Sequence, residues 1–419
     1  MNYTELETPC GKVKGISGDT YDEFRGIRYA TAERFEYPQQ VTQWNGVYDA
    51  TEFGNCAYQH RAFDDDAKVN AFYHNEFRKG LKFTYGEDCL FLNIWTPKKA
   101  EKCPVIVYIH GGSFTGGSAN EGQISGVKFA ENRIITVAMN YRLGAFGFCS
   151  HPDLRKNGAC GNFGLFDQAA AIKWVYDNIE AFGGDKNRIT LMGQSAGAMS
   201  VDIHLSNPLV KDMISGAIMI SGVGLQRLAL KPKTPEKSAA FWNKVMKAAG
   251  VSSVNELKTL DAEKLYRAWD GVCKASKLSL IDQMPVYDGI IMRKGEFDMG
   301  SVSDIPMIIS VTATDMMPPI LNALIKKWSK YAEKNFKSKC YVYHFDRLLP
   351  GDDKGAWHSC DLLYAFSTLD FNWRPFTELD RKISHQLSQS ICSFAKSGDP
   401  NCEAVPEWKS GYKNPMCFC

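Results

Sequence analysis

Short apolar runs alternate with longer amphipathic stretches through the middle of the chain. Residues 104–109 and 134–139 are continuous runs rich in β-branched and aromatic side chains, as expected of strands buried on both faces. Between residues 165 and 179 apolar side chains recur at spacings of three and four, which predicts a helix ended by the glycines at 183–184. Further strands are predicted at 188–192, 217–220, 305–311 and 340–345. This order is typical of a parallel sheet covered by helices.

The two ends of the chain follow other patterns. The first 100 residues hold shorter, alternating segments punctuated by Gly and Pro, which favours an antiparallel edge of the same sheet. Residues 224–282 indicate helices and loops inserted between strands, residues 64–66 a solvated acidic loop, and the tail after residue 400 irregular docked chain. No repeat or linker divides the chain, so we predict a single domain over 1–419.

Composition narrows the function classes. The chain has 49 Lys and Arg against 47 Asp and Glu, and 44% of its residues are hydrophobic. This balance excludes disorder as the main state and argues against a nucleic-acid-binding protein, which needs clustered basic residues. No run approaches the roughly 20 apolar residues of a membrane span, and the N-terminus lacks the features of a secretory signal.

Cysteine usage bears on the compartment and on metals. The chain contains 13 cysteines, an odd number, and they are scattered. This favours reduced, buried thiols in a cytoplasmic protein. Since no His/Cys cluster has zinc spacing, we expect no metal.

The motif that carries chemistry stands directly after the predicted strand at 188–192. Residues 193–197 read Gly-Gln-Ser-Ala-Gly and are followed by a helical pattern. A strand-to-helix turn this tight strains the serine, and glycine on either side avoids collisions. Ser195 is therefore a candidate nucleophile, held above the sheet at the start of a helix.

A serine hydroxyl becomes nucleophilic only with a base and a carboxylate that orients the base. In hydrolases that carry the serine on such a strand-to-helix turn, called a nucleophile elbow, the acid and then the histidine follow the serine along the chain. Of eight histidines, three come far enough after Ser195: His344, His358 and His385. His344 falls inside a predicted strand and His385 inside a predicted helix, whereas His358 lies in a polar loop after the last of these strands and is the chosen base.

The acid should stand at the carboxyl end of an intervening strand. Asp315 follows the strand at 305–311 and would orient the imidazole and stabilise its cation. Asp288, which precedes a glycine and looks like a turn residue, and Asp304, at the opposite end of that strand, are its rivals.

A glycine-rich turn supplies the remaining requirement. After the strand at 104–109 come His110, Gly111, Gly112 and Ser113. Such a turn lets backbone N–H groups reach a carbonyl oxygen without obstruction by side chains.

Taken together, these motifs are similar to those of the type-B carboxylesterases, the family of cholinesterases and bacterial para-nitrobenzyl esterases. The matching stretches are 87–95, 110–114, 140–144, 161–168, 182–185 and 193–197, with weaker matches at 288–289, 304–306, 341–345 and 358. The resemblance implies an α/β-hydrolase fold: a mostly parallel central sheet with an antiparallel N-terminal edge and helices on both faces.

The resemblance also implies an activity and its residues. It predicts hydrolysis of small-molecule carboxylic esters by water, through an acyl-enzyme and without a cofactor. Ser195, Asp315 and His358 would form the triad, and the backbone N–H groups of Gly112, Ser113 and Ala196 would form the oxyanion hole, with Gly111 and Gln194 beside them. No nucleic acid, membrane or obligatory protein partner is expected. Thioester or amide hydrolysis, and a non-catalytic interaction protein on the same fold, remain alternatives.

Several positions depart from the family pattern. Gln194 and Asp315 stand where glutamates are usual, so the loop of the shorter Asp315 must approach His358 more closely, and Ser113 replaces a glycine. A shortened lid region at 316–340 predicts a broad, open cleft. No Trp lies between Cys56 and Cys89, so the platform for a quaternary ammonium is missing, and this cysteine pair, oxidised in secreted relatives, is expected to be reduced.

Overall fold

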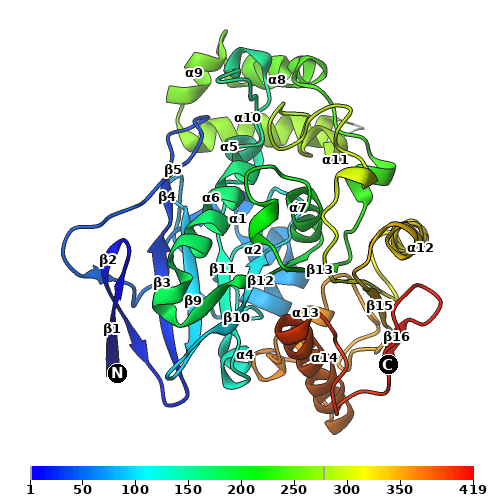
Figure 1. Ribbon diagram of the computed structural model, residues 1–419. Coiled ribbons are helices and arrows are strands. Elements are labelled where there is room, and N and C mark those ends of the chain that lie inside the picture. The colour runs from blue at the N-terminus through cyan, green and yellow to red at the C-terminus, as the bar shows by residue number, and fades with distance from the viewer. Residues whose placement is uncertain (1, 277–278) are drawn as a thin grey trace.

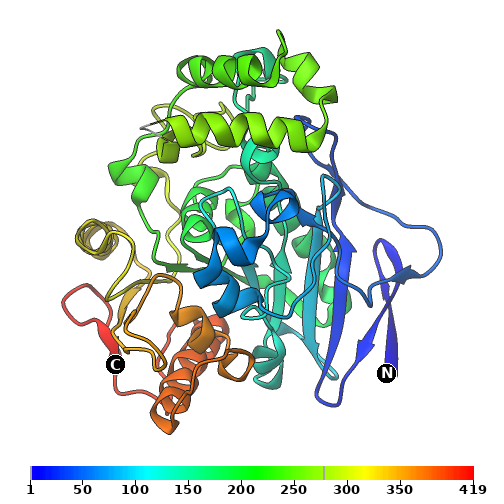
Figure 2. The same cartoon turned by 180° about the vertical axis from the view of Figure 1, so that it is seen from behind.

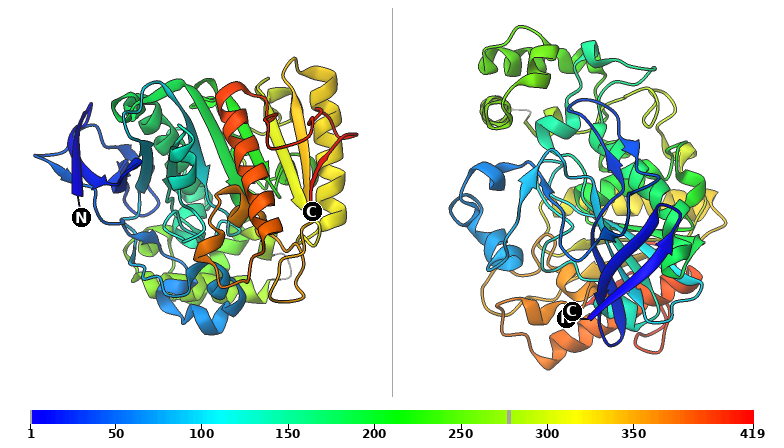
Figure 3. Two further views of the ribbon diagram at one scale, coloured as in Figure 1. Left: turned by 90° about the horizontal axis from the view of Figure 1, so that it is seen from below. Right: turned by 90° about the vertical axis from the view of Figure 1, so that its left-hand side faces the viewer.

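The computed structural model describes residues 2–276 and 279–419 and is built on one large twisted sheet (Figure 1). Along the sheet the strands are β1 (Asn2–Thr8), β2 (Gly11–Ser17), β3 (Tyr21–Arg28), β9 (Phe91–Pro97), β11 (Ile135–Met139), β10 (Cys103–Ile109), β12 (Gly184–Gln194), β13 (Gly216–Ile220), β14 (Met307–Thr312), β15 (Cys340–Phe345) and β16 (Met416–Phe418), and β6 (Tyr48–Asp49) pairs with β2. β1 and β16 lie at opposite ends of this sheet (Figure 3).

Pairing changes sense once along the sheet. From β1 to β11 the neighbours are antiparallel, whereas β11, β10 and all strands beyond them are parallel. This confirms the parallel sheet with an antiparallel N-terminal edge. The parallel register pairs Ile109 with Gly193 and Gln194 with Ile220, which brings the carboxyl ends of three neighbouring strands together. A site built on the loops after these strands follows directly from this register.

Helices cover both faces of the sheet because alternate strand residues point to opposite sides. Val107 of β10 belongs to a buried core cluster that includes side chains of α6 (Phe163–Asn178), α7 (Ala196–His204) and α12 (Pro318–Asn335). Its neighbour Tyr108 belongs to a second cluster, on the other face, that includes side chains of α4 (Val127–Glu131), α13 (Asp361–Ala365) and α14 (Glu378–Ser397). The buried strands are therefore apolar on both faces, as their continuous hydrophobic runs predict.

The region expected to be a helical insertion contains α8 (Pro235–Ala249), α9 (Val254–Thr259), α10 (Ala262–Ala275) and α11 (Ser279–Asp282). α8 and α10 pack together, and α10 packs against α5 (Gly144–Phe148), within a third core cluster that also includes Phe35 and Phe163. These helices lie beyond one end of the central strands (Figure 2). In the segment 316–340, expected to be a shortened lid, the one long helix is α12, which connects β14 to β15 and packs on both strands.

Short elements complete the described residues. They are the pairs β4 (Ala30–Thr31) with β5 (Gln39–Gln40) and β7 (Cys56–Ala57) with β8 (Tyr85–Gly86), the helices α1 (His60–Phe63), α2 (Asp66–Val69) and α3 (Ala71–Tyr73), the π-helices η1 (His74–Arg78) and η5 (Leu225–Ala229), and the 3₁₀ turns η2 (Pro152–Leu154), η3 (Ile179–Phe182), η4 (Lys211–Met213), η6 (Met299–Ser301) and η7 (Leu369–Phe371). None of the helices described is long and apolar enough to cross a bilayer.

One sequence interpretation is wrong and a second holds only in part. The tail is not only irregular chain, because Met416–Phe418 forms β16 and pairs in parallel with β15. Of residues 64–66, the first two lie in a loop in which Asp65 is exposed, as predicted, but Asp66 begins α2 and is half-buried. Asp65 caps α2, and the Asp66 carboxylate binds Arg78 through two hydrogen bonds of 2.7 and 3.1 Å. The acidic run alone does not indicate that Arg78, 12 residues further along the chain, folds back onto Asp66.

Candidate active site

Ser195 occupies the elbow between β12 and α7. Its backbone has φ 56° and ψ −122°, and its N–H donates to the carbonyl oxygen of Ile220 at 2.8 Å. A Cβ at Gly193 would collide with the carbonyl oxygen of Gly197, and a Cβ at Gly197 would collide with that of Ile109. The flanking glycines are thus sterically required, as the motif predicts.

The loops after β14 and β15 bring Asp315 and His358 together. Asp315 Oδ1 accepts a hydrogen bond from His358 Nδ1 at 2.5 Å. Backbone pairing between the two loops sets this distance, because the N–H of Thr314 donates to the carbonyl oxygen of Ala356 at 3.1 Å. Asp315 therefore reaches the imidazole although its side chain is shorter than the glutamate usual at this position.

The second carboxylate oxygen of Asp315 is also satisfied. It accepts hydrogen bonds from Ser221 Oγ at 2.6 Å and from the backbone and hydroxyl of Thr312 at 3.2 and 3.1 Å. Burial alone would raise the pKa of Asp315, but the hydrogen bond and positive charge of His358 outweigh it, and the pKa lies below its usual value. Asp315 is therefore an ionised acceptor that orients the ring.

Gln194 contacts the other side of the imidazole. Its Nε2 lies 3.1 Å from His358 Nε2, and the Gln194 side chain is buried. With the Nδ1 proton directed at Asp315, Nε2 carries a lone pair that accepts a hydrogen from the amide. Among the described residues no hydrogen bond joins Ser195 Oγ to the ring, although Ser195 and His358 line one cavity.

The turn after β10 has the backbone expected of an anion-binding loop. Gly112 and Ser113 both adopt positive φ, 109° and 57°. Their N–H groups, and that of Ala196, have no hydrogen-bond acceptor within the described part of the chain. His110 anchors the turn by stacking on Tyr141, with the two ring centroids 4.4 Å apart. Burial lowers the pKa of His110 to about 4, so its ring is neutral near pH 7.

A cavity of about 280 Å³ joins these groups. Its lining includes Gly111, Gly112, Ser113, Gln194, Ser195 and His358. The cavity also holds groups that sequence reasoning missed, above all Arg61, Arg78 and Glu121, which come from segments with no recognisable motif. Ser221 was missed as well, although its place directly after β13 was a signal that could have found it.

The rejected candidates lie elsewhere. Asp288 is buried against Asn162, and Asp304 accepts from the N–H groups of residues 337 and 338. His344 is within β15, and His385 is exposed on α14.

The described residues show no grouped metal ligands, and Cys56 and Cys89 are not bonded to each other. Among the described residues no three His, Cys, Asp or Glu side chains are grouped to hold an ion. Cys56 and Cys89 are free, and Cys56 Sγ lies 3.0 Å from Ser118 Oγ. Burial raises the pKa of Cys56 to about 11, which makes it a poor nucleophile near pH 7.

Comparison with known proteins agrees with this geometry. The chain matches the Carboxylesterase family over residues 2–334 and 319–417. It is 30% identical to the para-nitrobenzyl esterase of Bacillus subtilis (strain 168) over 469 aligned residues, which cover 97% of this chain and 92% of the relative.

Solved structures give the same result. A PNB esterase structure superposes with a TM-score of 0.83 at 28% identity, covering 97% of this chain and 93% of that one. A carboxylesterase from Geobacillus stearothermophilus superposes with a TM-score of 0.79 at 27% identity, covering 97% and 94%. The fold and the site thus define an α/β-hydrolase that acts on carboxylic esters as a serine esterase. The chain belongs to the carboxylesterase family.

Proposed function

We propose that Ser195, His358 and Asp315 are the catalytic residues of this esterase. The observation that carries the proposal is the 2.5 Å contact between Asp315 and His358 beside the cavity that also holds the Ser195 elbow. Asp315 directs the Nδ1 proton, which leaves Nε2 free to act as a base once the Gln194 amide yields its place to the serine hydroxyl.

The reaction proceeds in two acyl transfers. His358 Nε2 takes the Ser195 proton as Oγ bonds to the ester carbonyl carbon, and the carbonyl oxygen becomes an oxyanion. The N–H groups of Gly112, Ser113 and Ala196 hold that charge, and their lack of an acceptor among the described residues supports this role. The bond to the alcohol oxygen breaks as His358 returns the proton to it. Water then repeats the sequence and releases the acid.

The test is hydrolysis of para-nitrophenyl acetate with covalent labelling by an organophosphate. The protein should hydrolyse the ester and lose activity as one phosphoryl group attaches at Ser195, and Ser195→Ala should abolish both. Ser200→Ala is the matched control, because Ser200 lies in the same helix with its hydroxyl bonded to the carbonyl oxygen of Ala196. Full activity in Ser195→Ala, or labelling at another residue, would refute the assignment. Anilide and thioester analogues in the same assay report on the alternative hydrolyses.

We propose a narrower substrate range than an open cleft would allow. The cavity of about 280 Å³ is near the lower end of ligand pockets and supports short acyl or alcohol groups. Comparing para-nitrophenyl acetate with the corresponding naphthoate tests this, and equal kcat/KM values would favour the broad, open cleft.

We also propose a cytoplasmic location. All 13 cysteines are free thiols, most of them buried, which suits a reducing compartment. Lysing the producing cells directly into denaturant that contains an alkylating agent should label every cysteine, whereas cysteines that resist labelling until a reductant is added would argue against this location.

A further inference from the structure

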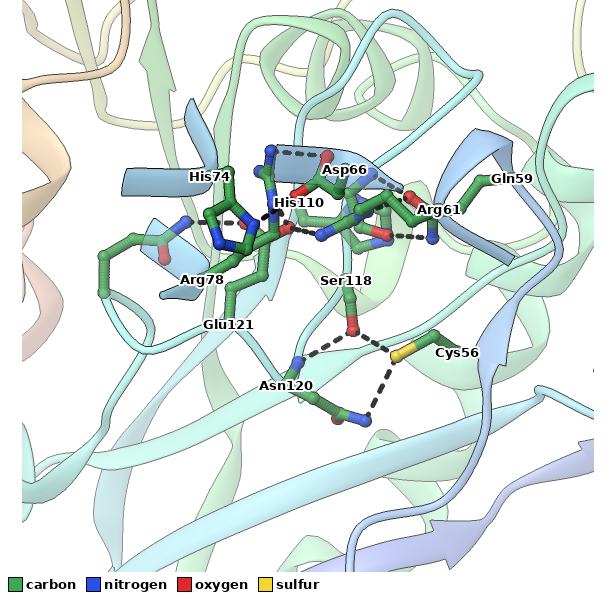
Figure 4. A network of polar contacts seen from close by, with 12 residues as sticks. Cys56, Gln59, Arg61, Asp66, His74, Arg78, His110, Ser118, Asn120 and Glu121 are labelled. Atoms are coloured by element: carbon green, nitrogen blue, oxygen red, sulfur yellow. Dashed lines mark hydrogen bonds and ion pairs between the residues drawn. The ribbon is translucent and has the colours of Figure 1, made fainter. Parts of the chain in front are cut away.

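One wall of the cavity beside Ser195 carries charged side chains that the catalytic proposal does not use. We call this wall, formed by His60, Arg61, Arg78 and Glu121, the arginine wall. Figure 4 shows Arg61, Arg78 and Glu121 gathered with Asp66 in one polar network. The wall comes from α1, η1 and the loop after the glycine-rich turn, all separate from the catalytic loops.

Both guanidinium groups are held in place by hydrogen bonds. Arg61 Nε donates to Gln59 at 2.8 Å, and its Nη1 donates to Glu121 at 2.7 Å. Arg78 Nε and Nη2 donate to the Asp66 carboxylate. The side chains of Arg61 and Arg78 are only 3% and 7% exposed. Because the two guanidinium groups are already immobilised, binding a ligand to them costs little additional side-chain entropy.

Each arginine still has a terminal nitrogen available. Within the described part of the chain, Arg61 Nη2 has no hydrogen-bond partner, and Arg78 Nη1 lies 3.6 Å from Glu121 Oε1, beyond hydrogen-bond distance. Neither nitrogen is enclosed by protein, and both residues line the cavity. The two side chains that carry these donors therefore line the space that a substrate of Ser195 would enter.

The two arginines are balanced in charge by Glu121 and Asp66, so the unfilled N–H donors of this wall, rather than its net charge, favour an anion. Two arginines and one carboxylate, Glu121, line the cavity, whereas Asp66, the second counter-ion, is not among the lining residues. Asp66 also takes contacts at 3.0 Å from His60 and His74, so its acceptor capacity is heavily used. An apolar substrate group that displaced water here would leave charged donors unpaired, which costs binding energy, while a carboxylate would satisfy them.

We propose that the arginine wall is a carboxylate subsite and that the esterase prefers esters bearing a free carboxylate a few bonds from the scissile carbonyl, such as monoesters of short dicarboxylic acids. This inference names the substrate class of the catalytic site proposed above and rests on it.

The experiment compares matched acidic and neutral esters. Mono-para-nitrophenyl glutarate is paired with para-nitrophenyl valerate for an acyl-borne carboxylate, and 4-acetoxybenzoate with 4-methylphenyl acetate for an alcohol-borne one. The wild type should favour the acidic member of at least one pair by about 10- to 100-fold in kcat/KM, the range of one or two hydrogen bonds to a charged group. No preference in either pair overturns the proposal.

Substitution assigns the preference to the wall. Arg78→Gln or Arg61→Gln should move the acidic-to-neutral ratio toward one. Arg188→Gln should keep the wild-type ratio, because Arg188 lies near the amino end of β12, away from Ser195, in an ion pair with Asp185. An unchanged ratio in both wall variants would refute the role of the arginines.

Binding without turnover separates the subsite from catalysis and covers variants that fail to fold. Glutarate should bind the wild-type protein in titration calorimetry and compete with para-nitrophenyl acetate, whereas the neutral diamide of the same acid should do neither. Equal binding of the two overturns the subsite. Glutarate binding in a protein that hydrolyses no ester would instead overturn the catalytic proposal and leave the subsite standing.

Discussion

Gln194 and His358 face each other across the site, with the Gln194 amide nitrogen 3.1 Å from His358 Nε2. The imidazole is thus engaged on both sides, by a carboxylate at Nδ1 and by a neutral amide at Nε2, the nitrogen that accepts the serine proton in the proposed mechanism. In the mechanism proposed above, the second contact is exchanged for one with Ser195. On that proposal, Gln194 governs both the charge next to His358 and the availability of its Nε2.

Replacing this amide by a carboxylate should change the pH dependence. Gln194→Glu would place a negative charge next to Nε2 and stabilise the imidazolium, the inactive form of the base. The acid limb of the kcat/KM profile for para-nitrophenyl acetate should therefore move to higher pH. Gln194→Ala, which removes the contact without adding charge, is the control and should move the limb less. A shift to lower pH in Gln194→Glu would contradict this account.

Asp315 should tolerate neither neutralisation nor lengthening. Asp315→Asn removes the acceptor that selects the tautomer, and kcat should fall by about 10³- to 10⁴-fold, as in other hydrolases with this relay. Asp315→Glu keeps the charge but adds a methylene where the aspartate side chain is fully buried, so it should be less active than the wild type. Steady-state kinetics, with circular dichroism to confirm folding, tests both. An Asp315→Glu variant as active as the wild type would show that the loop carrying residue 315 can move to accommodate the longer side chain.

The two glycine contexts predict opposite stability changes. Gly197→Ala should unfold the elbow or destabilise the protein by about 3 kcal/mol or more, because its Cβ meets the carbonyl oxygen of Ile109 at the heart of the sheet. Gly271→Ala is the matched control. Gly271 lies inside α10 with nothing near its added Cβ, so the variant should gain about 0.5–1 kcal/mol. Urea unfolding measures both, and a neutral Gly197→Ala would disprove the steric argument.

Asp66 should make stability depend on acid pH. Burial alone would raise its pKa, but hydrogen bonds and charge from Arg78, with contacts from His60 and His74, lower it to about 2. A carboxylate with a depressed pKa stabilises the folded state above its unfolded pKa of about 3.9, and this contribution is lost as pH falls through the folded value.

The wild type should therefore exceed Asp66→Asn in unfolding free energy by about 1–2 kcal/mol near pH 7, because solvent screening reduces the full value of the pKa shift. The difference should shrink as pH falls from about 4 toward 2. Chemical denaturation of both proteins across this range measures it. A difference that stays constant with pH would show that the Asp66 carboxylate is not held in this network.

The features predicted from sequence depend on short-range physics. The strand at 104–109 is predictable because a continuous apolar run indicates burial on both faces of a sheet. The helix that begins at Phe163 is predictable because apolar residues recur at spacings of three and four. The Ser195 elbow was recognisable because its steric demand for glycine falls on adjacent positions. The pairing of Asp315 with His358 was predicted because parallel strands end at one edge of the sheet, so chain order and strand position were sufficient.

Only the tertiary structure decided which side chains complete the site. The contact between Gln194 and His358, the Ser221 hydroxyl on Asp315 and the arginine wall join segments far apart in the chain. A polar side chain can bond in many directions, and its choice depends on which neighbours folding brings within about 3 Å. The added strand β16 has the same origin, because three residues carry too little pattern to indicate a strand until an open sheet edge pairs with them.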